Sequence, residues 1–309
     1  ADHAGAAFLT DDYLGPREVG GDVAAEQCLA LPGDAPLGLI FHSAFCGSTM
    51  LLRALDRPGV AMGLSEPVVL NDVVGFRRRG ADPRAVARAA DAATRLLARP
   101  FGPGEAVVIK PSNVVNPLAE LLLMLRPKAQ AIFLHAPLET FLISVVRKGL
   151  PCRLWVRELL EGYLRENFVQ LGFEPQDYFR QSDLQVAAVG WLAQHMHFAR
   201  LAAKLGPERL RSLDADRMTA DPAAAIAASA MHFGLSLTPE VLGEIVSGPA
   251  FTRHSKSGAA FNAETRTSEY AAARAAHGEE IDLVLRWAAQ VAERAGIAMQ
   301  APAPLLAQA

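Results

Sequence analysis

The chain has 309 residues, 51% of them hydrophobic, and a formal net charge of −3. This length allows one large core or two modest domains, and the scattered prolines and glycines mark no linker between two domains. A slightly acidic chain with mixed charges is not typical of a protein that wraps nucleic acid or lies on an anionic membrane. We therefore expect a single domain over residues 1–309 whose partners are small molecules.

The cysteines and the N-terminal residues bear on the compartment. Cys28, Cys46 and Cys152 are too few for a disulfide framework and lie in apolar surroundings typical of buried, reduced thiols. Residues 1–10 have neither a basic nor an apolar leader region, and no apolar run reaches the roughly 18–20 residues that cross a bilayer. These features predict a soluble, cytoplasmic protein.

The N-terminal part of the chain contains one strong structural signal. Residues 1–37 are polar and rich in turn residues, which predicts irregular structure or an edge hairpin. The apolar run 38–42 then predicts a strand, and a turn of small residues at 43–49 leads into an amphipathic helix that begins near Met50. We expect a strand, a tight loop and a helix here.

Strands and helices alternate along the rest of the chain. Further strands are expected at 60–62, 106–110, 129–134 and 209–213. Helices are expected at 82–99, from 111, at 138–148, over 155–205 with a break near 172–177, at 222–233 and at 282–295. This alternation predicts an α/β fold with a doubly wound, mostly parallel five-stranded sheet flanked by helices.

The turn after the first strand is a candidate anion site. Backbone N–H groups in such a turn converge at the positive end of the following helix, where they bind phosphate groups. The hydroxyl groups of serine and threonine add donors, whereas an ordinary turn with a Ser/Thr cap is the alternative. The candidate nucleotide-binding residues are Ser43, Ala44, Phe45, Cys46, Gly47, Ser48 and Thr49.

This turn is not a Walker A sequence. That motif requires lysine directly before the Ser/Thr, and Ser48 occupies the place. A nucleoside triphosphate with magnesium would lose its main side-chain clamp, which disfavours ATP hydrolysis.

The turn with its core Gly47-Ser48-Thr49 resembles the 5′-phosphosulfate loop of sulfotransferases. Three later stretches resemble segments of that family in the same order: the strand and Pro-Leu pair at 129–138, the strand, acidic turn and Phe-Gly-Leu at 210–235, and the basic stretch 252–258. The likeness covers residues 38–260. It implies a P-loop-type fold that uses 3′-phosphoadenosine-5′-phosphosulfate as donor and needs no metal.

The resemblance also implies roles for individual residues. Residues 43–49 would hold the 5′-phosphosulfate. The 3′-phosphate would lie near a set of polar and basic side chains, His135, Ser144, Arg253 and Lys256. Glu66 stands where several similar sulfotransferases carry the base that takes a proton from a hydroxyl or amine acceptor. A turn glutamate before Pro67 is the alternative, and the acceptor itself stays open.

Three positions depart from the pattern of the family. Phe45 stands at the usual lysine or arginine of the loop, His135 at the usual arginine, and Ser144 one residue later than the common spacing. Lys110 is a candidate replacement cation, because doubly wound folds collect ligand groups at the carboxyl ends of strands. A lysine that reaches from a buried strand to water is the alternative.

Other polar residues have two possible explanations each. His42 is a second candidate base or a core histidine at the end of its strand. Arg147 and Lys148, near Ser144 on its helix, are candidates for the 3′-phosphate or for solvated surface charges. Arg153 and Arg157 flank an aromatic residue, a pattern that suits an acidic or aromatic acceptor or simple helix packing.

Two further pairs are expected to be structural. Asp214 and Asp216 have no third ligand nearby in sequence. His195 and His197 lie two positions apart on a helix and so point in different directions, which makes a poor metal site.

The sequence favours an enzyme that transfers a sulfuryl group from 3′-phosphoadenosine-5′-phosphosulfate to an unidentified hydroxyl or amine. Two alternatives stay open. One is an ATP-dependent phosphotransferase of the same fold, which the missing Walker lysine disfavours. The other is a non-catalytic nucleotide-binding protein, which Phe45 and His135 would explain.

Overall fold

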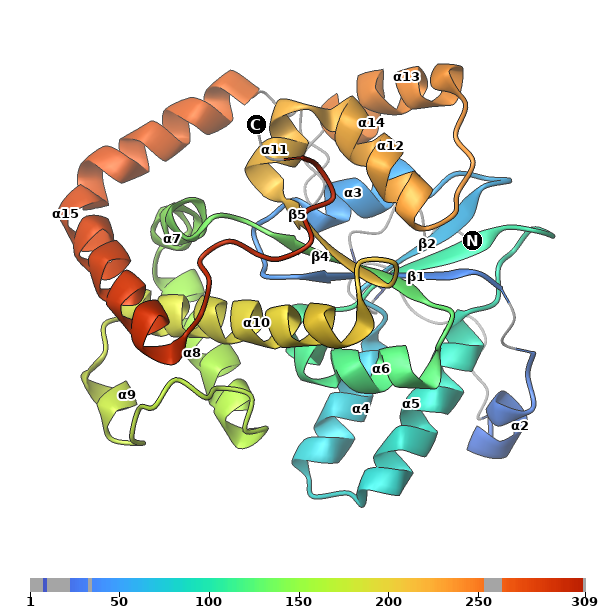
Figure 1. Ribbon diagram of the computed structural model, residues 1–309, viewed down its shortest axis with the longest axis horizontal. Helices are drawn as coiled ribbons and strands as arrows, with labels where there is room; N and C mark the ends of the chain where they lie inside the picture. Colours follow the sequence, from blue (N-terminus) through green and yellow to red (C-terminus); the bar gives the residue numbers. More distant parts are fainter. Residues whose placement is uncertain (1–7, 10–22, 33–34, 253–262, 308–309) are drawn as a thin grey trace.

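The computed structural model describes residues 8–9, 23–32, 35–252 and 263–307. Its centre is a sheet of five parallel strands in the order β2-β3-β1-β4-β5 (Figure 1). The strands are β1 (Leu37–His42), β2 (Ala61–Ser65), β3 (Ala106–Lys110), β4 (Gln130–His135) and β5 (Leu210–Asp214). The expected α/β fold with a five-stranded parallel sheet is confirmed.

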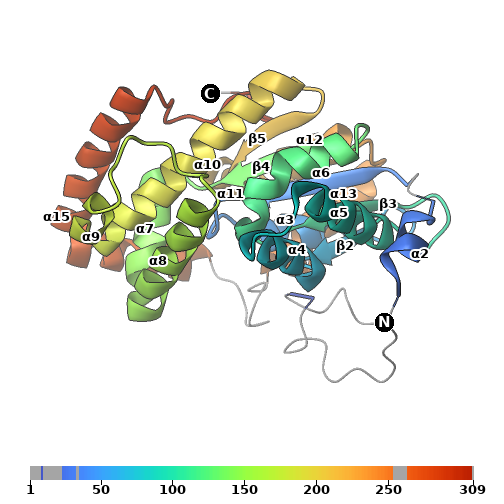
Figure 2. The same ribbon diagram turned by 90° about the horizontal axis from the view of Figure 1, so that it is seen from below.

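Helices cover both faces of this sheet. Those of the described part are α2 (Ala25–Leu29), α3 (Ser48–Leu55), α4 (Val68–Arg78), α5 (Pro83–Leu97), the 3₁₀ helix η2 (Asn113–Leu118), α6 (Ala119–Leu125), α7 (Leu138–Arg147), α8 (Gly149–Arg165), α9 (Asp177–Arg180), α10 (Asp183–Leu205), α11 (Ala215–Ala220), α12 (Pro222–His232), α13 (Pro239–Ser247), α14 (Pro249–Thr252) and α15 (Ala263–Ala295). Figure 1 shows α3 and α12 above the sheet and α4, α5 and α6 below it. The long helix α15 packs against α7 and α10 (Figures 1 and 2).

The strands divide their apolar side chains between two cores. Leu39 and Phe41 of β1 belong to the core between the sheet and α4, α5 and α6. Ile40, which lies between them in sequence, belongs to the core on the opposite face of the sheet. Side chains that alternate along a strand point to opposite faces, so a strand buried on both sides is apolar throughout. This explains why the sequence shows short continuous apolar runs.

The connections of the sheet place the 43–49 loop at a topological switch point. From β1 the chain runs to the β2 edge, whereas from β4 it runs to β5 on the other edge. Adjacent strands whose connections leave in opposite directions open a crevice at their carboxyl ends, where doubly wound folds bind ligands. The N–H group of Ser43 donates to the Leu134 carbonyl of β4 (3.1 Å), which fixes the loop at this crevice.

The structure differs from the sequence-based expectation in several elements. Within 1–37, expected to be irregular or a hairpin, residues 25–29 form α2. Helix α4 was not expected, and the helix expected from 111 is a 3₁₀ helix that contains Pro117. The C-terminal helix begins at Ala263 and not near 282. In the described part, no helix is long and apolar enough to span a membrane, and the three cysteines are buried and free, as expected for the thiols.

Buried histidines predict how stability depends on pH. Burial lowers the pKa of His135, His195, His197 and His232, that of His197 to about 4. Because the same groups titrate near 6.5 when unfolded, the unfolded chain binds more protons than the folded chain below that pH. We expect the free energy of unfolding to be largest above pH 6.5 and to fall toward pH 4, by up to about 1.4 kcal/mol per pH unit for each such histidine.

Urea unfolding between pH 7.5 and pH 4.5 measures this effect. The His197→Asn variant, which loses one of these groups, should show a shallower decline than the parent. An unfolding free energy that stays constant over this range would contradict the expectation.

Candidate functional site

The carboxyl ends of three neighbouring strands bring together His42, Glu66 and Lys110, which we call the strand-end cluster. Lys110 is the last residue of β3, and Glu66 directly follows the adjacent strand β2. The Lys110 ammonium forms an ion pair with Glu66 Oε1, and the N–H group of Glu66 donates to the Lys110 carbonyl at 2.7 Å. The Lys110 side chain is fully buried, whereas that of Glu66 is 21% exposed. The carboxylate is therefore partly open to solvent, whereas its partner cation is enclosed by the protein.

The backbone of Glu66 is held in an unfavourable conformation. Its φ is 49°, in the left-handed region that costs a residue with a Cβ roughly 1–2 kcal/mol. The hydrogen bond and ion pair to Lys110, with Pro67 directly after, hold the backbone in this state. Strain that the surroundings maintain is concentrated at functional positions, which makes Glu66 a stronger candidate than a turn glutamate.

His42 lies beside Glu66 in this cluster, and the hydrogen bond to its ring indicates which nitrogen carries the proton. Its Nδ1 accepts a hydrogen bond from the N–H group of Ala44 at 3.1 Å, so the neutral ring carries its proton on Nε2. Nε2 lies 3.8 Å from Glu66 Oε1. A protonated Nε2 has no lone pair to take a proton, so this geometry favours Glu66 over His42 as the base.

The 43–49 loop has the geometry of an anion site. Residues 38–55 form the expected strand, loop and helix. Ala44, Phe45 and Gly47 have positive φ values of 70°, 53° and 77°, and no side chain caps the N-terminus of α3. The N–H groups of Ser43 and Ala44 donate to the Leu134 carbonyl and to His42 Nδ1, so the candidate donors for an anion are those later in the loop and at the start of α3. Phosphate binding here stays a prediction.

Two neighbours fix the shape of this loop. The Ser43 hydroxyl accepts a hydrogen bond from the N–H group of Ala136 at 3.3 Å, which ties the loop to the end of β4. A Cβ on Gly47 would lie 2.9 Å from the Met218 side chain, in addition to the strain of its positive φ. Glycine is therefore the residue that this position accepts.

Cys46 lies inside the loop and is not a reactive thiol. It is 1% exposed, and burial raises its pKa to about 11, although interactions with Ser48 and Ser43 act in the opposite direction. The thiol stays protonated at neutral pH and is therefore a poor nucleophile.

The Phe45 ring packs outward against two helices. Its centroid lies 5.8 Å from that of Phe141 on α7 and 5.4 Å from that of Trp155 on α8. The Lys148 ammonium lies 5.3 Å from the centroid of the Phe45 ring. The position that lacks a basic side chain in this loop thus has a lysine beside it from another part of the chain, which the sequence did not reveal.

The structure describes two of the four residues that are expected at the 3′-phosphate. The buried Ser144 hydroxyl shares a 2.5 Å hydrogen bond with the Tyr270 hydroxyl of α15. His135 is buried at the end of β4, where desolvation lowers its pKa. Arg253 and Lys256 lie outside the described residues, so a common position with Ser144 is untested.

Several other candidates have structural partners. Arg153 and Arg157 both pair with Asp183 of α10, at 3.7 and 2.6 Å, which explains them by helix packing. Asp214 caps α11 and Asp216 accepts from the Thr140 hydroxyl at 2.8 Å, as expected for structural residues.

The two histidines of α10 contact different aromatic neighbours. The His195 ring stacks on that of Trp191, with 3.4 Å between the ring centroids, and the His197 ring lies 4.8 Å from that of Phe168 by the same measure. In the described parts of the chain, no three His, Cys, Asp or Glu side chains form a group that suits a metal ion.

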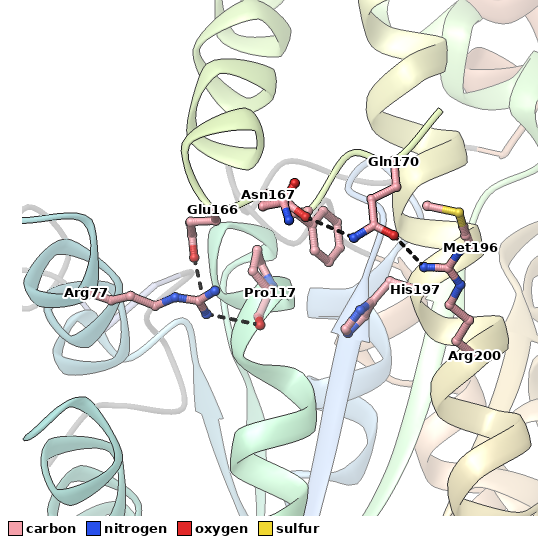
Figure 3. Close-up of a pocket in the computed structure, with 9 residues that line it drawn as sticks. Arg77, Pro117, Glu166, Asn167, Gln170, Met196, His197 and Arg200 are labelled. Carbon is pink, nitrogen blue, oxygen red and sulfur yellow. Dashed lines mark hydrogen bonds and ion pairs between the residues drawn. The ribbon is translucent and has the colours of Figure 1, made fainter. Parts of the chain in front are cut away.

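A cavity of about 180 Å³ lies apart from the strand-end cluster, among α4, η2, α10 and the segment after α8 (Figure 3). Arg77 donates to the Pro117 carbonyl at 3.3 Å and pairs with Glu166, and Arg200 donates to Gln170 at 2.9 Å. The cavity is lined by Arg77, Pro117, Glu166, Asn167, Phe168, Gln170, Met196, His197 and Arg200. The predicted catalytic and nucleotide-binding residues do not line it.

No protein-family model matches this chain, and no curated protein is significantly similar to it. Among solved structures, it is similar to sulfotransferase STF1 from Mycobacterium tuberculosis, with 16% identity and a TM-score of 0.45 over 80% of this chain and 79% of that one. Sulfotransferase STF9 from Mycobacterium avium has 14% identity and a TM-score of 0.47 over 84% of this chain and 79% of that one. A sulfotransferase from Alicyclobacillus acidocaldarius has 16% identity and a TM-score of 0.40 over 69% and 90%. Similarity at this level assigns no activity to this chain.

Proposed function

We propose that this protein is a sulfotransferase-like enzyme that transfers a sulfuryl group from 3′-phosphoadenosine-5′-phosphosulfate to a hydroxyl or amine of a small molecule. The observation that carries the proposal is the Glu66–Lys110 ion pair at the strand ends beside the 43–49 loop. It places a partly exposed carboxylate next to a buried cation on the edge of the sheet where such folds bind ligands. The motifs of the loop and of the later stretches resemble sulfotransferases in the same order along the sequence.

In this proposal the 43–49 loop holds the 5′-phosphosulfate of the donor. The later N–H groups of the loop and the positive end of α3 would face the negative charge of the phosphate, because those of Ser43 and Ala44 donate to protein acceptors. His135, Ser144, Arg253 and Lys256 are the proposed residues for the 3′-phosphate. Because Ser144 is buried against Tyr270, its hydroxyl would have to exchange that partner for the phosphate.

The transfer itself is an in-line displacement at sulfur. The acceptor oxygen or nitrogen forms a bond to sulfur while the bond from sulfur to the phosphate oxygen breaks, and adenosine 3′,5′-bisphosphate leaves. Glu66 takes the proton that the acceptor loses, and His42 lies beside the carboxylate, with its Nε2 atom 3.8 Å from Oε1. Lys110 and the loop donors stabilise the charge that develops on the leaving phosphate, so catalysis consists mainly of positioning and electrostatics.

A non-catalytic nucleotide-binding protein is the second candidate. The observation that favours it is Phe45, which has no charge and packs against Phe141 and Trp155. An ATP-dependent phosphotransferase is less well supported, because Ser48 replaces the Walker lysine. The three buried free thiols are compatible with the reducing cytoplasm that we propose as the compartment.

A comparison of thermal stability with two nucleotides tests the donor class. We expect adenosine 3′,5′-bisphosphate to raise the melting temperature, because a ligand that binds only the folded chain stabilises it by about 2.7 kcal/mol at one hundred times its Kd. ATP with magnesium should give a smaller shift at the same concentration. Equal or larger stabilisation by ATP with magnesium would overturn the proposal, and bisphosphate binding without transfer to a broad acceptor panel would favour the non-catalytic candidate.

A further inference from the structure

The 43–49 loop contains no basic side chain, although the proposed ligand carries several negative charges there. Backbone donors alone bind an anion less strongly than donors combined with a cationic side chain, because the cation adds Coulomb attraction to the hydrogen bonds. Lys110 is the nearest candidate from the strand ends, but its ammonium is fully buried and forms an ion pair with Glu66. A second cation at the loop would come from another element.

The junction of α7 and α8 supplies such a cation. Lys148 directly follows α7, and Gly149, with a positive φ of 68°, begins α8. The exposed Lys148 side chain lies beside Phe45 of the loop, with its ammonium 5.3 Å from the centre of the ring. A cation within about 6 Å of an aromatic face is attracted by the ring.

Phe45 is itself held in place, so it can position the lysine. Its ring packs against Phe141 of α7 and Trp155 of α8, the two helices that flank Lys148. The same residue has a backbone φ of 53° in the middle of the loop. The aromatic side chain therefore links the curvature of the loop to the position of the ammonium.

We propose that Lys148 is the cation of the 43–49 loop and contacts the 5′-phosphosulfate group of the donor, with the Phe45 ring as its support. This rests on the proposed function and assigns a donor-binding residue that lies outside the loop in sequence. It also gives Lys148 a role at the 5′ end of the nucleotide and not at the 3′-phosphate. The neighbouring Arg147 pairs with Glu269 and has a separate role.

The test compares two nucleotides that differ at the 5′ position. Adenosine 3′,5′-bisphosphate has a phosphate for the loop, whereas adenosine 3′-monophosphate has none. Calorimetry on the full chain measures the Kd of both for the parent, for Lys148→Met and for the control Lys204→Met, which removes an exposed lysine of α10 that pairs with Glu120 of α6. We expect Lys148→Met to weaken binding of the bisphosphate about tenfold, as for a lost charge-assisted hydrogen bond, and to leave the monophosphate unchanged. Lys204→Met should change neither Kd.

Each other outcome contradicts a specific part of the inference. An equal loss for both nucleotides would place Lys148 at the 3′-phosphate, and unchanged binding of both would make it a surface charge that only packs on Phe45. Either result overturns the role of Lys148 while the proposed function stands. A parent that binds neither nucleotide overturns the proposed function, and the role of Lys148 with it.

Discussion

The Glu66→Gln variant is expected to transfer sulfuryl groups about 10²–10⁴ times more slowly than the parent, the range that a positioned general base contributes. The amide has nearly the same shape as the carboxylate and can still accept a hydrogen bond from Lys110, but it cannot take the proton of the acceptor. Binding of adenosine 3′,5′-bisphosphate should stay nearly unchanged, because Glu66 is assigned to the acceptor and not to the nucleotide. Rates of transfer and calorimetric binding measure the two quantities separately.

A control for folding is needed because this substitution removes the charge that balances Lys110. A buried charge that loses its partner destabilises a protein, and the Lys110 ammonium is fully buried. Urea unfolding of the parent and the variant shows whether a slow variant is still folded under assay conditions. If a folded Glu66→Gln variant transfers sulfate as fast as the parent, Glu66 is not the base, and His42 becomes the candidate in spite of the proton on its Nε2.

Most of the sheet could be predicted from the sequence, because each strand is buried on both faces and so appears as a short apolar run. β3 was predicted with its observed bounds, Ala106–Lys110, and β4 and β5 lie within one residue of the expected ranges. Helix α4 was harder to predict, because it contains four β-branched valines in its first seven residues and then Gly75, all poor helix formers. Its packing on the sheet through Leu70, Val73 and Val74 outweighs that low propensity.

The components of the strand-end cluster could be predicted, but not their pairing. Lys110 follows from the rule that ligand groups gather at the carboxyl ends of parallel strands. That its ammonium meets Glu66 depends on β2 lying directly beside β3, an order of strands that the sequence does not state. The positive φ of Glu66 was also inaccessible, since glutamate ordinarily avoids this conformation and tertiary contacts impose it.

The contact between Lys148 and Phe45 could not be predicted from the sequence, for a different reason. The two residues are 103 positions apart, and their meeting depends on how α7 and α8 pack against the loop. The sequence showed a phenylalanine where a sulfotransferase has a cation, and Lys110 was the reasonable replacement from the strand ends. Only the packing of two helices shows that a second lysine lies beside the substituted position.

The Lys110→Met variant is expected to lose both binding and turnover, which distinguishes it from Glu66→Gln. A charge that acts on the donor does so in the ground state and more strongly when the leaving phosphate develops charge. We expect binding of the bisphosphate to weaken by about tenfold, the loss of one charge-assisted interaction, and kcat/KM for the donor to fall by about 10²–10³. Methionine fills the buried volume without leaving a cavity, and the 21% exposed Glu66 can be solvated, so the variant should fold. Isothermal titration and initial rates at several donor concentrations measure the two effects. A variant with unchanged binding but slow transfer would instead make Lys110 a positioning residue that acts only through Glu66. In that case the double variant Glu66→Gln/Lys110→Met would transfer at the same rate as Glu66→Gln alone, because the two substitutions would remove the same function.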